Sequence, residues 1–343
     1  RPKWDHVNQI LRTKKVGILA IQEAHLKDED VAHLHEKFPS RLHILNNSDP
    51  LMTAAKGVAV IINKSLLPWK EAKQDILVPG RASLITIPWH SDEKLRILAV
   101  YAPNRTEDNK NFWDDLVKLW ETRRLPKPDI LLGDMNIVED PIDRLPARKD
   151  PDSAVESLSV LKHRLLLTDG WRSANESTIA YSYTQVATQS RSRIDRIYVS
   201  ARILRQSRNW DIETTGIHTD HKLASVEFSH PQSPFIGKGR WAIPLHCLSN
   251  KKLIREVREM GLKLEKEVDN VPEEEHWNEG RSVQKLFSNF KLDVVKMMKA
   301  YARTAAPLLE KKINIAKAKL HAATNETSLT VEERQLNMSV LEE

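Results

Sequence analysis

The stretch from Pro128 to Asn136, Pro-Asp-Ile-Leu-Leu-Gly-Asp-Met-Asn, constrains the fold more than any other part of the sequence. A short apolar run that follows a proline and ends at a glycine is typical of a buried strand. Asp134 and Asn136 follow Gly133, and side chains two positions apart on an extended backbone point to the same side. We therefore expect a carboxylate and a carboxamide side by side at the end of a strand, where α/β folds place their reactive groups.

This motif alone is compatible with two interpretations. Gly-Asp-x-Asn is also what an Asx turn at the end of a strand would show, and for an isolated motif that is the more common meaning. Alternatively, the carboxylate binds Mg²⁺ or activates a water while the carboxamide holds the water or a phosphate oxygen. The rest of the chain favours the second interpretation.

Further apolar runs predict a strand-rich core with interleaved helices. Strands are predicted at 16–21, 42–45, 57–62, 82–87, 95–101, 181–184, 193–199 and 223–228, and helices at 4–14, 31–38, 112–119 and 155–165. Several neighbouring strands form antiparallel-looking pairs. An α/β fold with two sheets packed between helices therefore suits the pattern better than one fully parallel sheet.

A change of composition at residues 229–234 predicts a boundary between a first domain, 1–230, and a helical extension, 231–343. Gly-Lys-Gly-Arg-Trp at 237–241 follows this boundary. Two apolar stripes, one from Leu253 to Val268 and one from Val283 to Tyr301, then predict a helical hairpin that packs on a partner surface. From Asn325 onward the chain looks frayed or cut from something longer.

The composition limits the classes of function. The 343 residues carry a formal charge of +6 and give a pI near 9.2, which permits a nucleic-acid partner without requiring one. Cys247 is the single cysteine, so no internal disulfide is possible, and a nuclear or cytoplasmic location is expected. No apolar stretch approaches the ~20 residues that cross a bilayer, so no membrane role is expected. No Ser/Cys-His nucleophile arrangement or thiolate zinc site is apparent.

Polar residues stand at the ends of several predicted strands. Glu23 ends the first strand, with His25 expected to be a bystander beside it, and Tyr101 and Asn104 end another in Tyr-Ala-Pro-Asn. Each has an ordinary alternative, because a strand-end Glu usually faces solvent and a Tyr is usually half-buried packing.

Asp195 is harder to dismiss, because it lies within an apolar strand and an unpaired buried carboxylate is costly. We expect His221 to be its partner. Asp220-His221 immediately precedes the last strand and would otherwise be read as a turn.

Together these residues predict metal-assisted attack on a phosphodiester. Glu23 offers a hard oxygen ligand to Mg²⁺, or to Mn²⁺, and Asp220 supports the metal side. Asp134, with Asn136 beside it, is expected to position and deprotonate the attacking water.

The remaining residues are expected to act on the phosphate. His221 contacts the scissile phosphate, while Asp195 orients the imidazole and favours its charged form. Tyr101 and Asn104 donate hydrogen bonds to the developing charge.

These motifs, in this order, resemble the endonuclease/exonuclease/phosphatase superfamily, which includes DNase I and exonuclease III. The resemblance covers about residues 4–230 and rests on Ile-Gln-Glu at 21–23, Tyr-Ala-Pro-Asn at 101–104, Gly-Asp-Met-Asn at 133–136, Ser-Arg-Ile-Asp at 192–195 and Asp-His at 220–221. Within the superfamily, Gln-Glu-Ala-His-Leu, Ser-Arg-Ile-Asp-Arg-Ile-Tyr-Val-Ser and Gly-Lys-Gly-Arg-Trp look most like the endonuclease domains of LINE-type non-LTR retrotransposons and of related fungal DNase I-like proteins.

The resemblance implies a four-layer α/β sandwich, dependence on Mg²⁺, and nicking of DNA to leave a 3′-hydroxyl that primes reverse transcription. It also implies that Thr184–Arg191 forms a surface hairpin that reads the shape of the minor groove. Arg191 and Arg193 are then the expected phosphate contacts.

The resemblance further implies neighbouring parts. A helical linker and a reverse transcriptase follow the nuclease in such elements, so residues 235–343 look like that linker, with a downstream reverse transcriptase or another partner for its helices. A first strand with an Asn at the metal site is implied before residue 4. The residues from Arg1 onward lack it, so the sequence is either a fragment or a decayed copy, and loss of this strand would impair activity.

Two alternatives stay open on the sequence. One is an enzyme on the same scaffold that hydrolyses a small phosphoester such as an inositol phosphate or sphingomyelin. The other is a non-catalytic remnant that binds nucleic acid or a protein partner.

Overall fold

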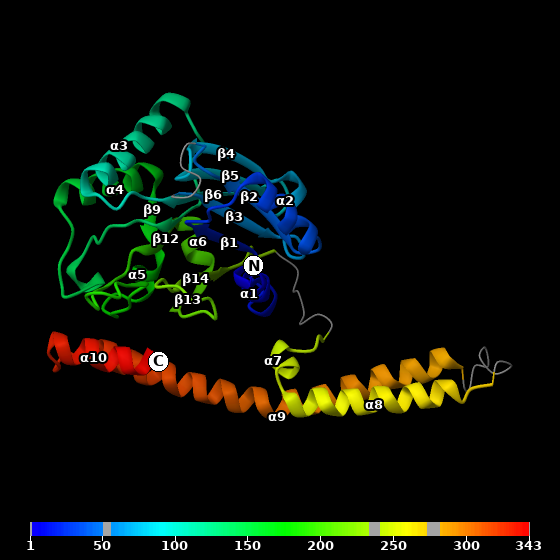
Figure 1. Ribbon diagram of the computed structural model, residues 1–343. Coiled ribbons are helices and arrows are strands. Elements are labelled where there is room, and N and C mark those ends of the chain that lie inside the picture. Colours follow the sequence, from blue (N-terminus) through cyan, green and yellow to red (C-terminus); the bar gives the residue numbers. More distant parts are fainter. Residues whose placement is uncertain (1, 51–55, 233–240, 273–281, 343) are drawn as a thin grey trace. The chain divides into compact units, whose positions relative to one another are not determined.

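The computed structural model describes residues 2–50, 56–232, 241–272 and 282–342 (Figure 1). They group into two compact units, one of residues 1–233 with 323–340 and the other of residues 234–322 with 341–343. The predicted division at residue 230 stays a prediction. Residues 323–340 group with the first unit and not with the helical extension.

A six-stranded sheet forms the centre of the first unit. Its strand order is β4 (Lys73–Val78), β5 (Ala82–Pro88), β6 (Lys94–Tyr101), β7 (Ile130–Asp134), β12 (Asp195–Ser200) and β9 (Leu167–Asp169). The strands β6 and β7 are parallel, and every other neighbouring pair is antiparallel. The sheet is therefore mixed.

Three smaller sheets accompany it. One has the order β1 (Ile18–Gln22), β3 (Val58–Asn63), β2 (Leu42–Asn47), and another pairs β13 (Ser207–Glu213) with β14 (Leu223–Phe228). The third has the order β10 (Tyr183–Thr184), β11 (Arg191–Ser192), β8 (Arg144–Leu145). The helices of this unit are α1 (Pro2–Thr13), α2 (Asp28–Lys37), α3 (Thr106–Arg123), α4 (Asp152–Leu165), α5 (Gly170–Ala174), α6 (Ala201–Gln206) and α10 (Val331–Glu342), with short 3-10 turns at Trp69–Glu71 and Pro141–Asp143.

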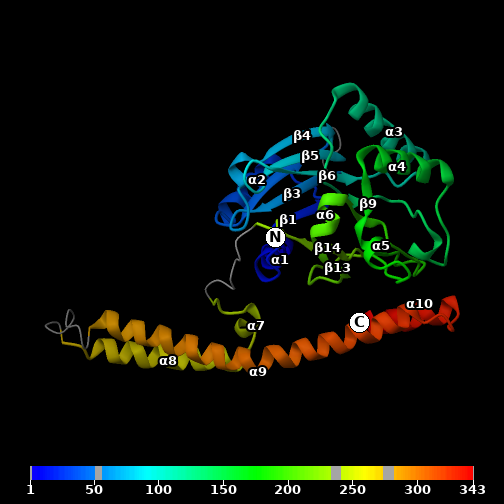
Figure 2. The same ribbon diagram turned by 180° about the vertical axis from the view of Figure 1, so that it is seen from behind.

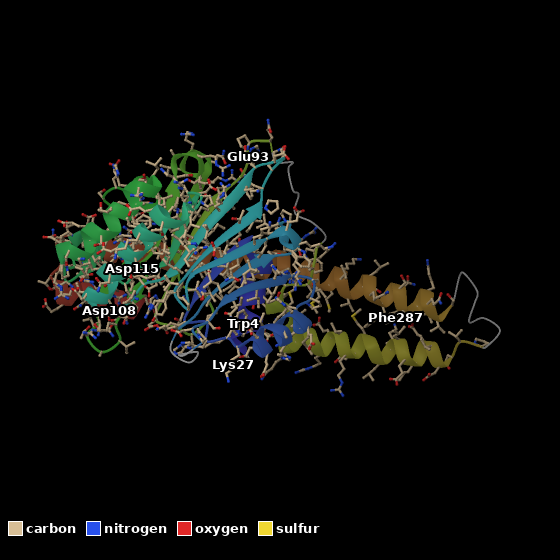
Figure 3. All side chains as sticks on the ribbon, turned by 90° about the horizontal axis from the view of Figure 1, so that it is seen from above. Trp4, Lys27, Glu93, Asp108, Asp115 and Phe287 are labelled. Atoms are coloured by element: carbon tan, nitrogen blue, oxygen red, sulfur yellow. The ribbon has the colours of Figure 1, made fainter. Side chains whose placement is uncertain are left out.

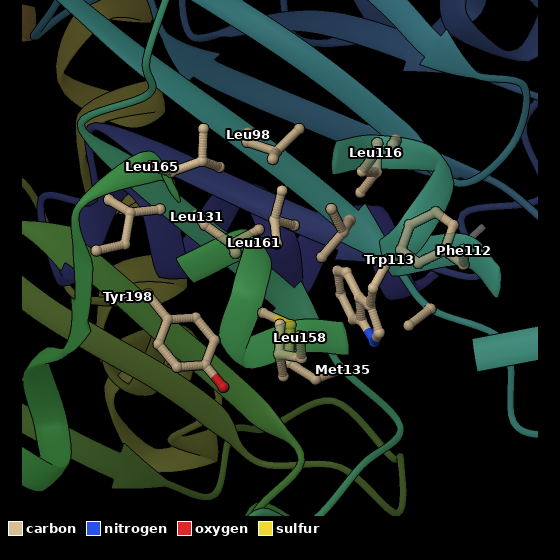
Figure 4. Close-up of a cluster of buried hydrophobic side chains, with 14 of the residues drawn as sticks. Leu98, Phe112, Trp113, Leu116, Leu131, Met135, Leu158, Leu161, Leu165 and Tyr198 are labelled. Carbon is tan, nitrogen blue, oxygen red and sulfur yellow. The ribbon is translucent and has the colours of Figure 1, made fainter. Parts of the chain in front are cut away.

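Alternating side chains on the strands build three separate cores, and these define the layers. On β3, Val58, Val60 and Ile62 pack toward the six-stranded sheet, while Ala59 and Ile61 pack toward α1 and α2. The third core lies between the six-stranded sheet and the helices α3 and α4 (Figure 4). The order is thus helices, sheet, sheet, helices, so the protein is a four-layer α/β sandwich, as predicted.

The helix α3 shows how the sequence orients an outer layer. Trp113 and Leu116 are fully buried against the sheet. Asp108 and Asp115 are exposed on the same helix (Figure 3). Burial of the apolar stripe decides which face turns inward.

The second unit contains α7 (Leu245–Leu248), α8 (Lys251–Asp269) and most of α9 (Val283–Asn325). α8 and the first part of α9 run side by side (Figures 1 and 2), and an apolar cluster that includes Leu253, Val257, Val294 and Met298 joins them. The predicted helical hairpin is confirmed. Residues 237–240 of the predicted Gly-Lys-Gly-Arg-Trp motif lie outside the described residues.

Among the elements that differ from expectation are two longer edge strands and the last helix. β4 and β13 have mostly polar, partly exposed residues and lie at sheet edges, so they lack the apolar run by which strands were recognised. The expected fraying after Asn325 is wrong, because α10 forms there. Thr330 and Glu333 cap its start reciprocally, with Glu333 N donating to Thr330 Oγ1 at 3.2 Å and Thr330 N donating to Glu333 Oε2 at 2.9 Å. No described helix has both the length and the apolar composition to cross a bilayer.

Candidate active site

Strand register places three of the predicted catalytic residues in one row. Asp134 is the last residue of β7 and pairs with Tyr101 of β6 in parallel register and with Asp195 of β12 in antiparallel register. Gly133, at φ 140°, permits this row, because a Cβ there would lie 1.9 Å from the carbonyl oxygen of Val100. The glycine in Gly-Asp-Met-Asn is thus required for the close approach of β6 and β7.

Asp134 and Asn136 do meet, but through a turn and not through an extended backbone. Asn136 has a left-handed φ of 48°, and its backbone N donates to Asp134 Oδ1 at 2.9 Å. Its Nδ2 donates to Asp134 Oδ2 at 3.1 Å and to the carbonyl of Ala102 at 2.9 Å. One hydrogen of the carboxamide therefore holds Asp134, and the other anchors the amide to the Ala102 carbonyl. The two interpretations of the motif coexist: an Asx turn holds the candidate catalytic carboxylate.

Asp195 and His221 form the predicted pair, with 2.8 Å between Asp195 Oδ2 and His221 Nδ1. Ser182, which is fully buried, binds the backbone of Asp195 and of Lys222, the residue after His221. Its Oγ accepts from Asp195 N at 2.9 Å, and its carbonyl accepts from the backbone N of Lys222 at 2.6 Å. No role for Ser182 is predicted from the sequence, because nothing in the Tyr-Ser-Tyr-Thr segment distinguishes this serine from its neighbours.

The electrostatics of this cluster suit proton transfer near neutral pH. Burial, followed by the charge of Asp195, raises the pKa of Asp134 to about 7. Burial by itself would lower the pKa of His221, but the hydrogen bond and charge of Asp195, with the charges of Asp134 and Asp220, raise it to about 9. His221 is therefore a cation at neutral pH, while Asp134 is poised to take up or release a proton.

Glu23 and Tyr101 meet directly, since the Tyr101 hydroxyl donates to Glu23 Oε1 at 2.5 Å. Burial and this hydrogen bond raise the pKa of Tyr101, so its hydroxyl stays protonated. Arg81 supports the tyrosine, because its guanidinium lies 5.0 Å from the centre of the Tyr101 ring and its Nη1 donates to the Tyr101 carbonyl at 2.9 Å. Arg81 follows a turn glycine, and nothing in the local sequence indicated its position.

A set of possible metal ligands lies in the same place. One ligand atom each from Asp134, Asp195 and His221 lie within 4.8 Å of one another. Glu23 and Asp220, the predicted metal ligands, do not belong to this set, although the charge of Glu23 acts on Asp134. Their assignment as ligands stays a prediction.

The cleft that contains these residues has a volume of about 1410 Å³. Every predicted site residue lines this cleft except Arg191 and Arg193. His25 also lines it. Among the described residues β1 pairs only with β3 and β14 only with β13, and both strands line the cleft. The first strand that the resemblance implies before residue 4 stays a prediction.

The expectation that Arg191 and Arg193 contact DNA phosphates is wrong. Both side chains are buried, at 0% and 1% exposure. Arg193 Nε and Nη2 donate to the two carboxylate oxygens of Asp143 at 2.8 and 2.7 Å, and Arg193 Nη2 lies 2.8 Å from Asp169 Oδ2. The arginine is committed to an internal ion-pair network, because a buried guanidinium needs carboxylate partners.

This network explains the charged residues of the Ser-Arg-Ile-Asp-Arg motif. Arg196 pairs with Glu139 at 2.8 Å and with Asp143 at 3.1 Å. The Tyr198 hydroxyl donates to Glu139 Oε1 at 2.6 Å. The side chains on one face of this strand anchor it, while Asp195 at its start turns toward the cleft.

Comparison with known proteins shows to which family this chain belongs. Residues 5–221 match the model of the endonuclease/exonuclease/phosphatase family. The chain belongs to this family. A nuclease-type phosphodiesterase is the class of activity that this membership supports.

One curated relative of the chain is the transposon TX1 uncharacterized 149 kDa protein of Xenopus laevis. It is 27% identical over 226 residues, which are 65% of this chain and 17% of the relative. The chain thus spans about a sixth of the length of that protein.

Several solved structures share the fold. The 3′ phosphatase NExo from Neisseria, bound to a product DNA hairpin, matches 67% of this chain and 95% of its own, with a TM-score of 0.53 and 18% identity. The AP endonuclease LMAP from Leishmania major matches 66% of this chain and 82% of its own, with a TM-score of 0.55 and 15% identity. The endonuclease domain of TRAS1, a telomere-specific non-LTR retrotransposon, matches 67% of this chain and 94% of its own, with a TM-score of 0.51 and 13% identity.

Proposed function

We propose that this chain is a divalent-metal-dependent DNA endonuclease of a LINE-type retrotransposon, or of a protein derived from one. The single observation that carries the proposal is the convergence of Asp134, Asp195 and His221 in one cleft, with ligand atoms within 4.8 Å of one another. The family membership and the transposon relative support a DNA phosphodiester as the bond attacked. Such a protein acts in the nucleus or the cytoplasm.

In this proposal Asp134 is the base. Asn136 fixes both of its oxygens, so the carboxylate keeps one orientation toward an attacking water. A pKa of about 7 lets it accept a proton at neutral pH, and general bases work best near the pH at which they operate.

His221 is the cation that holds the phosphate. Asp195 takes up Nδ1, which leaves Nε2 as the donor toward a phosphate oxygen. Its raised pKa keeps it charged through neutral pH. Tyr101, whose hydroxyl donates to Glu23, lines the same cleft, and Asn104 stands exposed at its rim.

The residues present fit Mg²⁺ or Mn²⁺ on the carboxylate side of the cleft. Hard divalent cations prefer oxygen donors, which Glu23 and Asp220 offer. A protonated His221 has no lone pair to give and therefore stays on the phosphate side. The bound ion would neutralise charge on the phosphate.

The test is nicking of supercoiled plasmid DNA with Mg²⁺, with Mn²⁺ and with EDTA. Asp134→Asn and His221→Gln are compared with Asp115→Asn, which changes an exposed carboxylate on α3 in the same way. We expect nicked circles with either metal, none with EDTA, and a loss of at least about 100-fold in both site variants, because each removes a proton-transfer or charge contribution. The control should match the parent.

The other outcomes identify the alternatives. Turnover of an inositol phosphate without nicking would replace DNA with a small phosphoester as substrate. Salt-dependent DNA binding without cleavage would indicate a non-catalytic remnant.

A further inference from the structure

The C-terminal segment of the first unit, residues 323–340, holds the chain that leads into the β10–β11 hairpin. Asn325 Oδ1 accepts from the backbone N of Ile179 at 2.8 Å, and Asn325 Nδ2 donates to the carbonyl of the same residue at 3.2 Å. One side-chain amide thus satisfies both backbone groups of Ile179, as a neighbouring strand would. Thr324, the preceding residue, is 5% exposed.

The helix α10 continues this contact with one face. Met338 is 1% exposed, whereas Leu336 and Val340 on the other side are 64% and 65% exposed. The charge of Arg334, one turn before Met338 on the same face of α10, acts on the buried Tyr181, which lies two residues before β10. Gln335 Nε2 then reaches the hairpin itself and donates to the carbonyl of Gln189 at 3.1 Å.

The hairpin tip, residues 185–190, has little else to fix its position. It is closed by its own polar groups: Gln185 N donates to Ser190 O, and Gln189 N to Gln185 O, each at 2.8 Å. Val186, its one large apolar side chain, is 74% exposed, so no buried anchor holds the tip. Loops without buried apolar contacts open at low free-energy cost, and contacts at base and tip therefore decide how often this one opens.

The same hairpin is joined to the candidate active site. Thr184 N donates to the Asp220 carbonyl at 3.1 Å, and the rings of Tyr183 and His221 lie 4.8 Å apart. The hairpin therefore stands beside the place where a phosphodiester would bind, and its position affects which duplex fits there.

We propose that Asn325 and Gln335 are positioning residues that clamp the β10–β11 hairpin, so that the C-terminal segment sets how duplex DNA is accepted by the cleft. The substrate half of this inference rests on the proposed function; the clamp itself does not. Neither residue touches the reacting groups, and both act through the hairpin. The C-terminal segment is thus a part of the substrate-binding apparatus.

The clamp is tested by hydrogen–deuterium exchange on the full chain, without DNA. Gln335→Glu removes the donor to Gln189 with almost no change of shape, and Asn325→Asp removes the donor to the Ile179 carbonyl. Asn337→Asp is the matched control, because it makes the same amide-to-acid change at an exposed position of α10. We expect exchange at the Gln185 and Gln189 amides to accelerate about tenfold in the two clamp variants, the factor that one ordinary hydrogen bond contributes to an opening equilibrium, and to be unchanged in the control. Equal exchange in all four proteins would overturn the clamp.

Steady-state nicking of a defined duplex tests the substrate half. The KM for DNA is expected to rise several-fold in both clamp variants, with kcat within about twofold of the parent, because the reacting groups are untouched. A fall in kcat at unchanged KM would contradict positioning of the substrate. A parent that neither binds nor nicks DNA would remove the proposed function and the substrate half together, while the exchange result would still decide the clamp.

Discussion

Asp195 and His221 lie 26 positions apart in the chain, yet Asp195 Oδ2 lies 2.8 Å from His221 Nδ1. The pair is held at its backbone by one serine, Ser182, and stands beside Asp134 in the adjacent strand. Its charge state follows from this arrangement, and the consequences are measurable in the protein without DNA.

The His221 ring should make stability depend on pH. Its pKa is about 9 in the folded protein against an ordinary value of 6.5, so the charged pair stabilises the fold fully below about pH 6.5, and that contribution is lost as the pH rises through 9. Urea denaturation at about pH 6 and pH 10 should show a decrease in the free energy of unfolding that is larger in the parent than in His221→Gln. We expect a difference on the order of 1–2 kcal/mol, because solvent screens a ring that is about one-third exposed.

The raised pKa of Asp134 gives a slope of the same sign, and the His221 charge, which lowers that pKa, is lost in the variant. Asp134→Asn and the double variant Asp134→Asn/His221→Gln are therefore compared over the same pH range, which isolates His221. Parallel curves for these two proteins would contradict the charged pair.

Asn136 combines a left-handed backbone with two side-chain hydrogen bonds, and two substitutions separate these contributions. Asn136→Gly keeps the backbone conformation but loses the amide, whereas Asn136→Ala loses the amide and strains the backbone. Both should lose nicking activity to a similar degree, because both release Asp134. Alanine should cost about 1 kcal/mol more in the free energy of unfolding. An active glycine variant would show that the amide does not orient Asp134.

Asp143 should be the most sensitive carboxylate in the internal network. It is 0% exposed, and Arg172, Arg193 and Arg196 all donate to it. Asp143→Asn should lower the free energy of unfolding by about 3–5 kcal/mol, because it leaves buried guanidinium groups without their counter-charge. Asp115→Asn, on the surface of α3, should change it by less than about 1 kcal/mol. Chemical denaturation measures both, and similar small losses would mean that Arg193 is not held internally.

Glu23 and Asp220 are predicted to bind the metal, and the metal requirement tests them directly. Glu23→Gln and Asp220→Asn should raise the Mg²⁺ concentration for half-maximal nicking by at least about tenfold, since each removes one charged oxygen donor. Glu36→Gln, an exposed change on α2, should leave it unaltered. An unchanged Mg²⁺ requirement with lower kcat would assign these residues to the substrate and not to the ion.

Local signals in the sequence were sufficient to predict the layers of the fold and the positions where strands end. Apolar runs of strand length, closed by glycine or proline, determined where β3, β6 and β7 lie, because a residue's burial there depends mainly on its own side chain and its near neighbours. The same runs placed Asp134, Tyr101 and Glu23 beside the cleft. The Thr330–Glu333 capping pair was a further local signal, and it would have predicted α10.

Only the tertiary structure decided which side chains meet in the cleft and which are buried elsewhere, because these outcomes depend on contacts between distant segments. The register of β12 against β7 brings Asp195 opposite Asp134, and a shift of one residue would have turned it away. The network around Asp143 turns Arg193 inward, although its sequence context suited a surface role. The contact of Asn325 with Ile179 spans 146 positions of the chain. Sequence by itself fixed which chemical groups this protein carries at its strand ends; packing between segments far apart in the chain decided which of them meet.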